Sequence, residues 1–180
     1  GIKDDNIYRL AIGSFLQLKD FIQAKKISDD FILHGNLNSD DYTNAGISYS
    51  QLEQHDKAME YYDKSLLLNP NNLYSLNNKG FTLTVLNKFN EAITLLDKAI
   101  HIDNSFAYSY NNRGLAKIKI GKREEGLEDI IKSIRLDENN AYAYRNLGIY
   151  HLDCNDFSKA LDLFKKAKDL DSSTYLIEDL

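Results

Sequence analysis

Asparagine recurs every 34 residues along most of this chain, at Asn44, Asn78, Asn112 and Asn146. A primary amide offers two N–H donors and an oxygen acceptor, so one side chain can pair with both the N–H and the C=O of an extended peptide. A column of such amides is suited to holding a peptide backbone with little regard to its sequence. The alternative is structural, with the same amides bonding a neighbouring helix or capping a turn.

Other residues share the register of this column and widen the candidate peptide-binding set. Tyrosine stands four residues before three of the asparagines, the residue just before an asparagine is polar, and an apolar residue follows three positions later. These added candidates are Asn77, Asn111, Arg145, Tyr74, Tyr108, Tyr142 and Phe81. Apolar walls beside amides suit a groove that takes the side chains of a peptide as well as its backbone. The tyrosines have an alternative role in packing between repeats.

The column is part of a longer periodic pattern. Residues 39–72, 73–106, 107–140 and 141–174 superimpose without insertion. Position eight holds Gly46, Gly80, Gly114 and Gly148, and position twenty holds Ala58, Ala92, Gly126 and Ala160. A fixed period with small residues at constant offsets is typical of stacked helix–turn–helix units. Each block reads as two amphipathic helices joined by short turns, so the helices must pack antiparallel, with the small residues where they cross closely.

The first complete block resembles the tetratricopeptide repeat family. Its matching residues are Tyr42, Ala45–Gly46, Tyr49, Ala58, Tyr62, Ser65 and Pro70. The resemblance covers residues 39–174, and residues 5–38 look like a diverged copy in which Ile12 replaces the glycine and Ser28 the large residue. It implies an all-α, right-handed superhelical solenoid of antiparallel helix pairs, forming a single array over residues 1–180.

The same resemblance implies a protein–protein interaction scaffold that binds a peptide or protein segment in a concave groove lined by the first helix of each pair. The asparagine column is similar to that of the repeat region of O-linked N-acetylglucosamine transferase. The lysines with which some family members clamp a C-terminal carboxylate are missing here. Arg9 and Arg145 are each able to pair with an acidic group, but they stand at opposite ends of the array.

Composition argues against several other classes of protein. The net charge of −5 disfavours nucleic acid as a partner, and the basic run at 117–123 is followed at once by Glu124 and Glu125, as in a solvated helix end. No stretch approaches the roughly 18 apolar residues of a membrane span. The single cysteine, Cys154, rules out an intramolecular disulfide and favours a cytoplasmic compartment. An exported chain that has lost a signal peptide is the alternative.

No constellation for catalysis or metal binding stands out. The four histidines occupy different positions of the repeat: His34, His55, His101 and His151. His151 and Cys154 lie three residues apart on one predicted helix, but two ligands do not make a metal site. We therefore expect no enzymatic activity, no cofactor and no metal.

The end of the sequence raises a separate question. Residues 175–180 read as the start of a capping or further helix that presents Leu176, Ile177 and Leu180. We expect the natural chain to continue past Leu180. The alternatives are a homo-oligomer that self-associates through the terminal repeat as a structural module, and a substrate-selecting fragment of a larger protein whose activity lies outside these residues.

Overall fold

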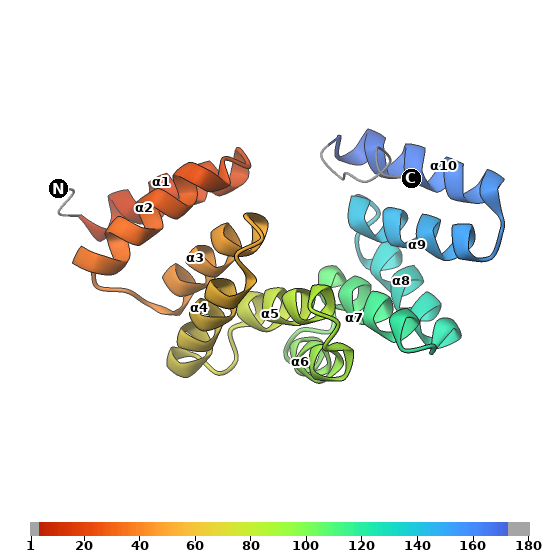
Figure 1. The fold of residues 1–180 in the computed structure, drawn as a ribbon, viewed down its shortest axis with the longest axis horizontal. Coiled ribbons are helices and arrows are strands. Elements are labelled where there is room, and N and C mark those ends of the chain that lie inside the picture. Colours follow the sequence, from red (N-terminus) through yellow and green to blue (C-terminus); the bar gives the residue numbers. More distant parts are fainter. Residues whose placement is uncertain (1–3, 173–180) are drawn as a thin grey trace. The chain divides into compact units, whose positions relative to one another are not determined.

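A computed structural model describes residues 4–172, and within them lie ten α-helices and no β-strand (Figure 1). The helices are α1 (Asp5–Gln17), α2 (Phe21–His34), α3 (Ser39–Gln51), α4 (His55–Leu68), α5 (Leu73–Val85), α6 (Phe89–Ile102), α7 (Ala107–Lys119), α8 (Arg123–Leu136), α9 (Ala141–Asp153) and α10 (Phe157–Leu170). The predicted all-α fold built from helix pairs is confirmed. The predicted helix start at 175–180 lies outside the described residues.

The chain divides into two compact units, residues 1–82 and 83–180. Helix α5 crosses this division, and its residues up to Thr82 are taken with the first unit. That all residues 1–180 form a single array stays a prediction.

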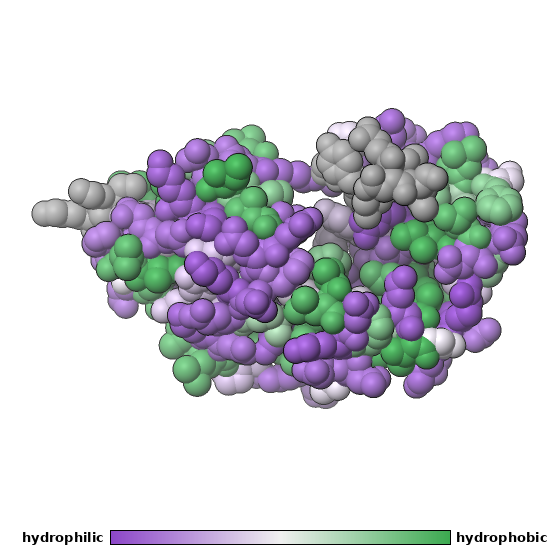
Figure 2. Space-filling model, viewed as in Figure 1, coloured by the Kyte–Doolittle hydropathy of each residue, from purple (hydrophilic) through white to green (hydrophobic). Residues whose placement is uncertain are grey.

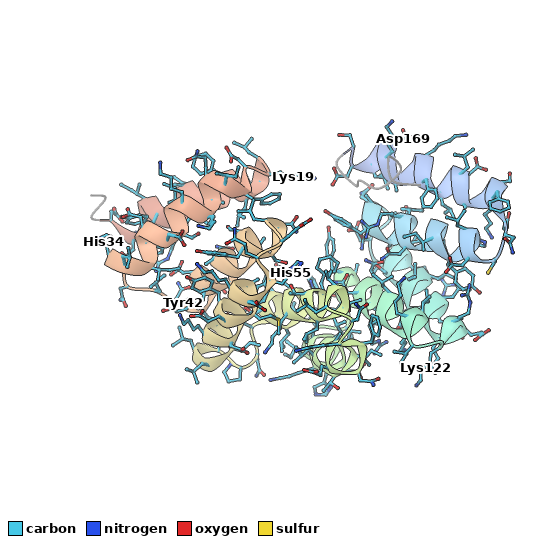
Figure 3. All side chains as sticks on the ribbon, viewed as in Figure 1. Lys19, His34, Tyr42, His55, Lys122 and Asp169 are labelled. Atoms are coloured by element: carbon cyan, nitrogen blue, oxygen red, sulfur yellow. The ribbon has the colours of Figure 1, made fainter. Side chains whose placement is uncertain are left out.

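The same three-residue turn connects the two helices of every pair, and this short connection makes them run antiparallel. The middle residue of each turn has a positive φ, at Lys19 (56°), Glu53 (58°), Asn87 (60°), Gly121 (87°) and Asn155 (61°). The N–H of the third turn residue bonds the carbonyl of the residue five positions earlier, as in Asp20 to Phe15 at 2.9 Å. This is the Schellman ending of a helix. Lys19 and Lys122, labelled in Figure 3, mark two of these turns.

In the first unit, the pair α1–α2 keeps its core volume although its sequence diverges. Ile12 occupies the position of the glycine, and the small Ser28 replaces the large residue that would collide with it. The large side chain has moved to Phe31, whose ring stacks on Tyr8 with centroids 4.7 Å apart. Exchanging large and small residues in this way preserves a filled core, because packing depends on total volume and shape.

The pair α3–α4 shows the regular arrangement of the repeat. A methyl group on Gly46 would lie 2.5 Å from the ring of Tyr62, so the glycine is what lets this ring enter the interface. Beside it, the hydroxyls of Thr43, Ser65 and Ser75 form a buried cluster with distances of 2.6–3.0 Å. The start of α3 is fixed to α1, because the carboxylate of buried Asp41 accepts hydrogen bonds from Nε and Nη2 of Arg9.

In the second unit, α7 and α8 approach closely where two glycines face each other. A methyl group on Gly114 would lie 2.6 Å from the carbonyl oxygen of Gly126, and the reverse is also true. Positions eight and twenty therefore do mark the crossing of the two helices in this block. Ile130 and Ala116 fill the space around it without solvent exposure.

Charged side chains occupy position seven of two blocks, where the family pattern has a leucine, and both end on carboxylates of the preceding block. Lys79 pairs with Asp63 in the first unit, and Arg113 pairs with Asp97 in the second at 2.7 Å. Long charged side chains at such a position can bury their stems and still reach water. The structure instead shows ion pairs between consecutive repeats.

Within residues 4–172, no helix combines the length and hydropathy needed to cross a lipid bilayer. On the face drawn in Figure 2, hydrophilic residues predominate and hydrophobic ones form separate small areas.

Candidate functional site

The candidate residues of the second unit lie on α7 and α9. These are the first helices of two consecutive blocks, and they contact each other directly. On α9, Arg145 and Asn146 stand three and four residues after Tyr142, and Ile149 stands three residues after Asn146, so the four residues share one helix face. Asn140 fixes the start of α9, because its side-chain oxygen accepts from Ala143 N and its Nδ2 donates to Ser133 Oγ on α8 at 3.0 Å.

Two hydrogen bonds join amides on these two helices to one another. Asn146 Nδ2 donates to Asn111 Oδ1 at 2.9 Å, across the interface between α9 and α7. Asn111 Nδ2 lies 3.5 Å from Asn112 Oδ1, at the limit of a hydrogen bond. Asn111, Asn112 and Asn146 are 2%, 9% and 2% exposed. A bond between helices is what the structural alternative predicts for Asn146, and it leaves little amide surface for a ligand there.

Arg145 lies beside this amide chain without a matching acid. Its Nε is enclosed and has no hydrogen-bond partner, and Nη2 lies 3.4 Å from Asn146 Oδ1. The guanidinium stands over the ring of Tyr142, 5.5 Å from its centroid. Burial lowers the pKa of Arg145 from its ordinary value, because removal from water disfavours the charged form and no carboxylate among the described residues offsets this.

Two tyrosines form the more accessible part of the same area. Tyr108 is 40% exposed and Tyr142 is 38% exposed. Burial of one side raises the pKa of the Tyr108 hydroxyl, and the nearby carboxylate of Asp137 raises it further. The Tyr108 phenol therefore stays neutral at physiological pH and can donate or accept hydrogen bonds.

The candidates of the first unit are in more varied settings. Asn78 Nδ2 donates to the carbonyl of Tyr74 in its own helix at 2.9 Å, and Tyr74 is largely exposed. Asn77 is buried, and Phe81 is half-buried. Asn44 is half-buried, and none of the hydrogen bonds shown within residues 4–82 uses its amide. A ligand-binding role for the eleven candidates stays a prediction.

The feature that the sequence did not reveal is the pairing of Asn146 with Asn111. A signal for it was present, since asparagine occupies positions five and six together at Asn77–Asn78 and at Asn111–Asn112. Adjacent amides can point to different neighbours, so one of each pair was available for contact between helices.

Chemistry-bearing side chains elsewhere in residues 4–172 do not converge. No three His, Cys, Asp or Glu side chains there are grouped to hold a metal ion. His151 Nδ1 lies 3.5 Å from Asp156, while the exposed Cys154 has its Sγ 3.5 Å from Arg123 Nη2.

Comparison with known families gives four matches, of which those over residues 39–72 and 107–140 coincide with two of the blocks that the period defines. Models described as "Tetratricopeptide repeat" match residues 39–72, 107–140 and 140–170, and a "TPR repeat" model matches residues 83–121. None of the curated proteins compared with the chain matches it.

Similar solved structures agree in fold at low sequence identity. The chain is similar to MamA, from position 41 to its end, of Desulfovibrio magneticus RS-1, with 23% identity over 98% of this chain and 99% of that one and a TM-score of 0.68. It is also similar to TTC0263, a thermophilic TPR protein in Thermus thermophilus, with 13% identity over 95% and 93% of the chains and a TM-score of 0.84. At these identities the likeness shows the fold alone.

Proposed function

The chain belongs to the tetratricopeptide repeat family, and we propose that it is a protein–protein interaction scaffold that binds a peptide or protein segment along the first helices of its repeats. The observation that carries this proposal is the pair of exposed tyrosines, Tyr108 and Tyr142, set one repeat apart on two helices in contact. Rigid, half-exposed aromatic side chains are the residues that most often anchor protein interfaces.

In this proposal the amides serve mainly to support the tyrosines from beneath. Since Asn111 and Asn146 bond each other, they hold α7 and α9 in register and thereby fix the spacing of the two tyrosines. A bound segment would lay its apolar side chains against the tyrosine rings and its polar groups against the phenol oxygens. This differs from a grip made by the asparagine column alone.

The proposal is of binding rather than catalysis, as the sequence predicts. A module that associates only with itself is the competing possibility. It predicts that the purified chain forms defined oligomers by light scattering and selects no foreign peptide.

Selection of random peptides displayed on phage, with the purified 180-residue chain as target, tests the scaffold directly. We expect enriched peptides that bind in fluorescence polarisation. Replacing Tyr108 and Tyr142 together by alanine should weaken binding about 10-fold or more, because truncating an anchoring aromatic typically costs at least about 1–2 kcal/mol. Because both rings are more than half-buried, the melting temperature of the double variant is measured as well, and binding is compared at a temperature at which both proteins are folded.

Phe157→Ala is the matched control. Phe157 is 63% exposed on α10, a second helix, so its truncation removes a comparable ring from a different surface. Equal loss of binding in this control and in the double tyrosine variant, or no enriched peptide at all, contradicts the proposal.

A further inference from the structure

The arginines of this chain differ in whether an acid meets them. The partners are Asp41 for Arg9 at 2.8 Å, Asp129 and Asp97 for Arg113 at 2.6 and 2.7 Å, and Asp153 for Arg123 at 3.8 Å. Arg135 is exposed to water. Arg145 alone among them is half-buried without an ion pair to any residue within 4–172. The chain has 27 acidic and 22 basic residues, so this is not for want of acids.

Nor do neutral acceptors replace the missing acid. Nε of Arg145 is enclosed and unpaired, although a guanidinium normally uses all of its donors when it leaves water. Within residues 4–172, the acceptor that the guanidinium meets is Asn146 Oδ1 at 3.4 Å, which is too long for a strong bond. Asn146 cannot turn toward the guanidinium freely, because its own Nδ2 is held by Asn111 at 2.9 Å.

An unpaired charge removed from water is costly for a folded protein, so a site that keeps one calls for a counter-ion from outside. Nε is enclosed, but the side chain as a whole is only half-buried, so its terminal amino groups are the atoms that an incoming ligand can reach. The ring of Tyr142, 5.5 Å away, flanks the same group and would shield an ion pair from solvent.

We infer that Arg145 binds a carboxylate of an acidic peptide segment, through its two terminal amino groups and beside the Tyr142 ring. This rests on the proposed scaffold function, because Tyr142 is one of the two anchoring tyrosines. A carboxylate fits better than a phosphate group. Its single negative charge matches a single guanidinium, and its two oxygens match the guanidinium fork.

The test uses two short blocked peptides, one of alternating Asp and Glu and the other its Asn and Gln counterpart, titrated into the ¹⁵N-labelled 180-residue chain. The Nε–H signal of Arg145 is the readout. We expect the acidic peptide to shift this signal and to bind about 10-fold or more tightly than the amide peptide. Arg145→Gln should abolish the difference, whereas Arg135→Gln, at an exposed arginine of α8, should leave it intact.

A thermal arm separates binding from folding. Because replacing Arg145 removes no ion pair from the described part of the chain, Arg145→Met should keep or raise the melting temperature. The acidic peptide should then raise the melting temperature of the parent chain and of Arg135→Gln but not of Arg145→Met. If Arg145→Met does not fold, Arg145→Lys, which keeps the charge but not the fork, takes its place with an intermediate affinity expected.

Three results overturn the inference: equal affinity for the acidic and amide peptides, tighter binding of inorganic phosphate than of the acidic peptide, or full binding by Arg145→Gln. Selected phage peptides whose affinity is indifferent to their acids would likewise overturn it while leaving the scaffold function in place. Failure of the phage selection would overturn the scaffold function, and the Nε–H titration would still report on Arg145 by itself.

Discussion

Asp129 is a buried carboxylate that holds two cations at once. Arg113 donates to it through Nε and Nη2, at 2.8 and 2.6 Å, and Lys117 Nζ lies 2.9 Å away. Burial by itself would lower the pKa of Arg113, but the hydrogen bonds to Asp129 and Asp97 raise it above the ordinary value. The carboxylate therefore compensates two long side chains that stand where the repeat pattern expects apolar residues.

Replacing Asp129 by asparagine should destabilise the chain by about 3 kcal/mol, since both cations would lose their buried counter-charge. Chemical denaturation gives the free energy of unfolding. Glu60→Gln is the control, because Glu60 and Lys64 form an exposed ion pair within one helix and its loss should cost about 0.5 kcal/mol or less. Equal effects of the two substitutions would show that burial of Asp129 is not what makes its charge important.

For single residues, the sequence predicts which residue types recur but not which neighbour each one faces. The period identifies Asn111 and Asn146, yet whether an amide points to solvent or to the adjacent helix depends on the rotation of α7 against α9. Similarly, the acids that meet Arg113 lie 16 residues away on either side, and only the packing of three helices brings them together.

The turn within each helix pair is the most regular element of the molecule, although its sequence varies. Lysine, glutamate, asparagine and glycine all occupy its left-handed middle position. A side chain with a Cβ is strained there by about 1 kcal/mol, and glycine is not. The turns therefore differ in stability although their backbones agree.

Gly121→Ala should lower the free energy of unfolding by about 1 kcal/mol, as a purely backbone effect, because no atom lies within 4 Å of the added methyl group. Glu53→Gly should raise it by about 0.5 kcal/mol, since relief of strain is partly offset by a more flexible unfolded chain. Thermal and urea unfolding measure both. A loss of stability in Glu53→Gly would mean that the glutamate makes a contact more valuable than the strain it carries.

Helix spacing in this fold could be predicted because the small residues recur at constant offsets, and the described helices form the antiparallel pairs that this spacing predicts. The positive φ values at Lys19 and Glu53 could not. Neither residue favours a left-handed conformation, and only the three-residue distance between consecutive helices imposes it. The core packing of α1–α2 could not be predicted from the repeat pattern either, because Phe31, at a position where the other blocks have a small residue, fills the volume that Ser28 leaves.

For the whole molecule, the division into two compact units predicts that damage stays local. Gly114→Ala should cost about 2–3 kcal/mol, because its methyl group would press on the Gly126 carbonyl in a close crossing. Repeats interact chiefly with their neighbours, so hydrogen exchange should accelerate in α7 and α8 and stay unchanged in α1 and α2.

Gly13→Ala is the matched control for that substitution. Gly13 lies inside α1 with nothing within 4 Å of a new methyl group, so alanine should stabilise the helix by about 1 kcal/mol. Uniform acceleration of exchange throughout the chain in Gly114→Ala would instead show that the two units unfold as one cooperative body.

The ion pairs between consecutive repeats make the order of the repeats matter, because the residues that meet at each boundary between two repeats are complementary. Asp63 with Lys79 and Asp97 with Arg113 join charged edges, whereas the equivalent places at the next border hold Ile131 and Leu147. A junction that set Asp63 or Asp97 against Leu147, or a copy of Lys79 or Arg113 against Ile131, would leave a lone charge facing an aliphatic side chain. Duplication of residues 73–106, which carry both Lys79 and Asp97, would therefore keep an ion pair at each border, whereas duplication of residues 107–140 would set the second copy of Arg113 against Ile131.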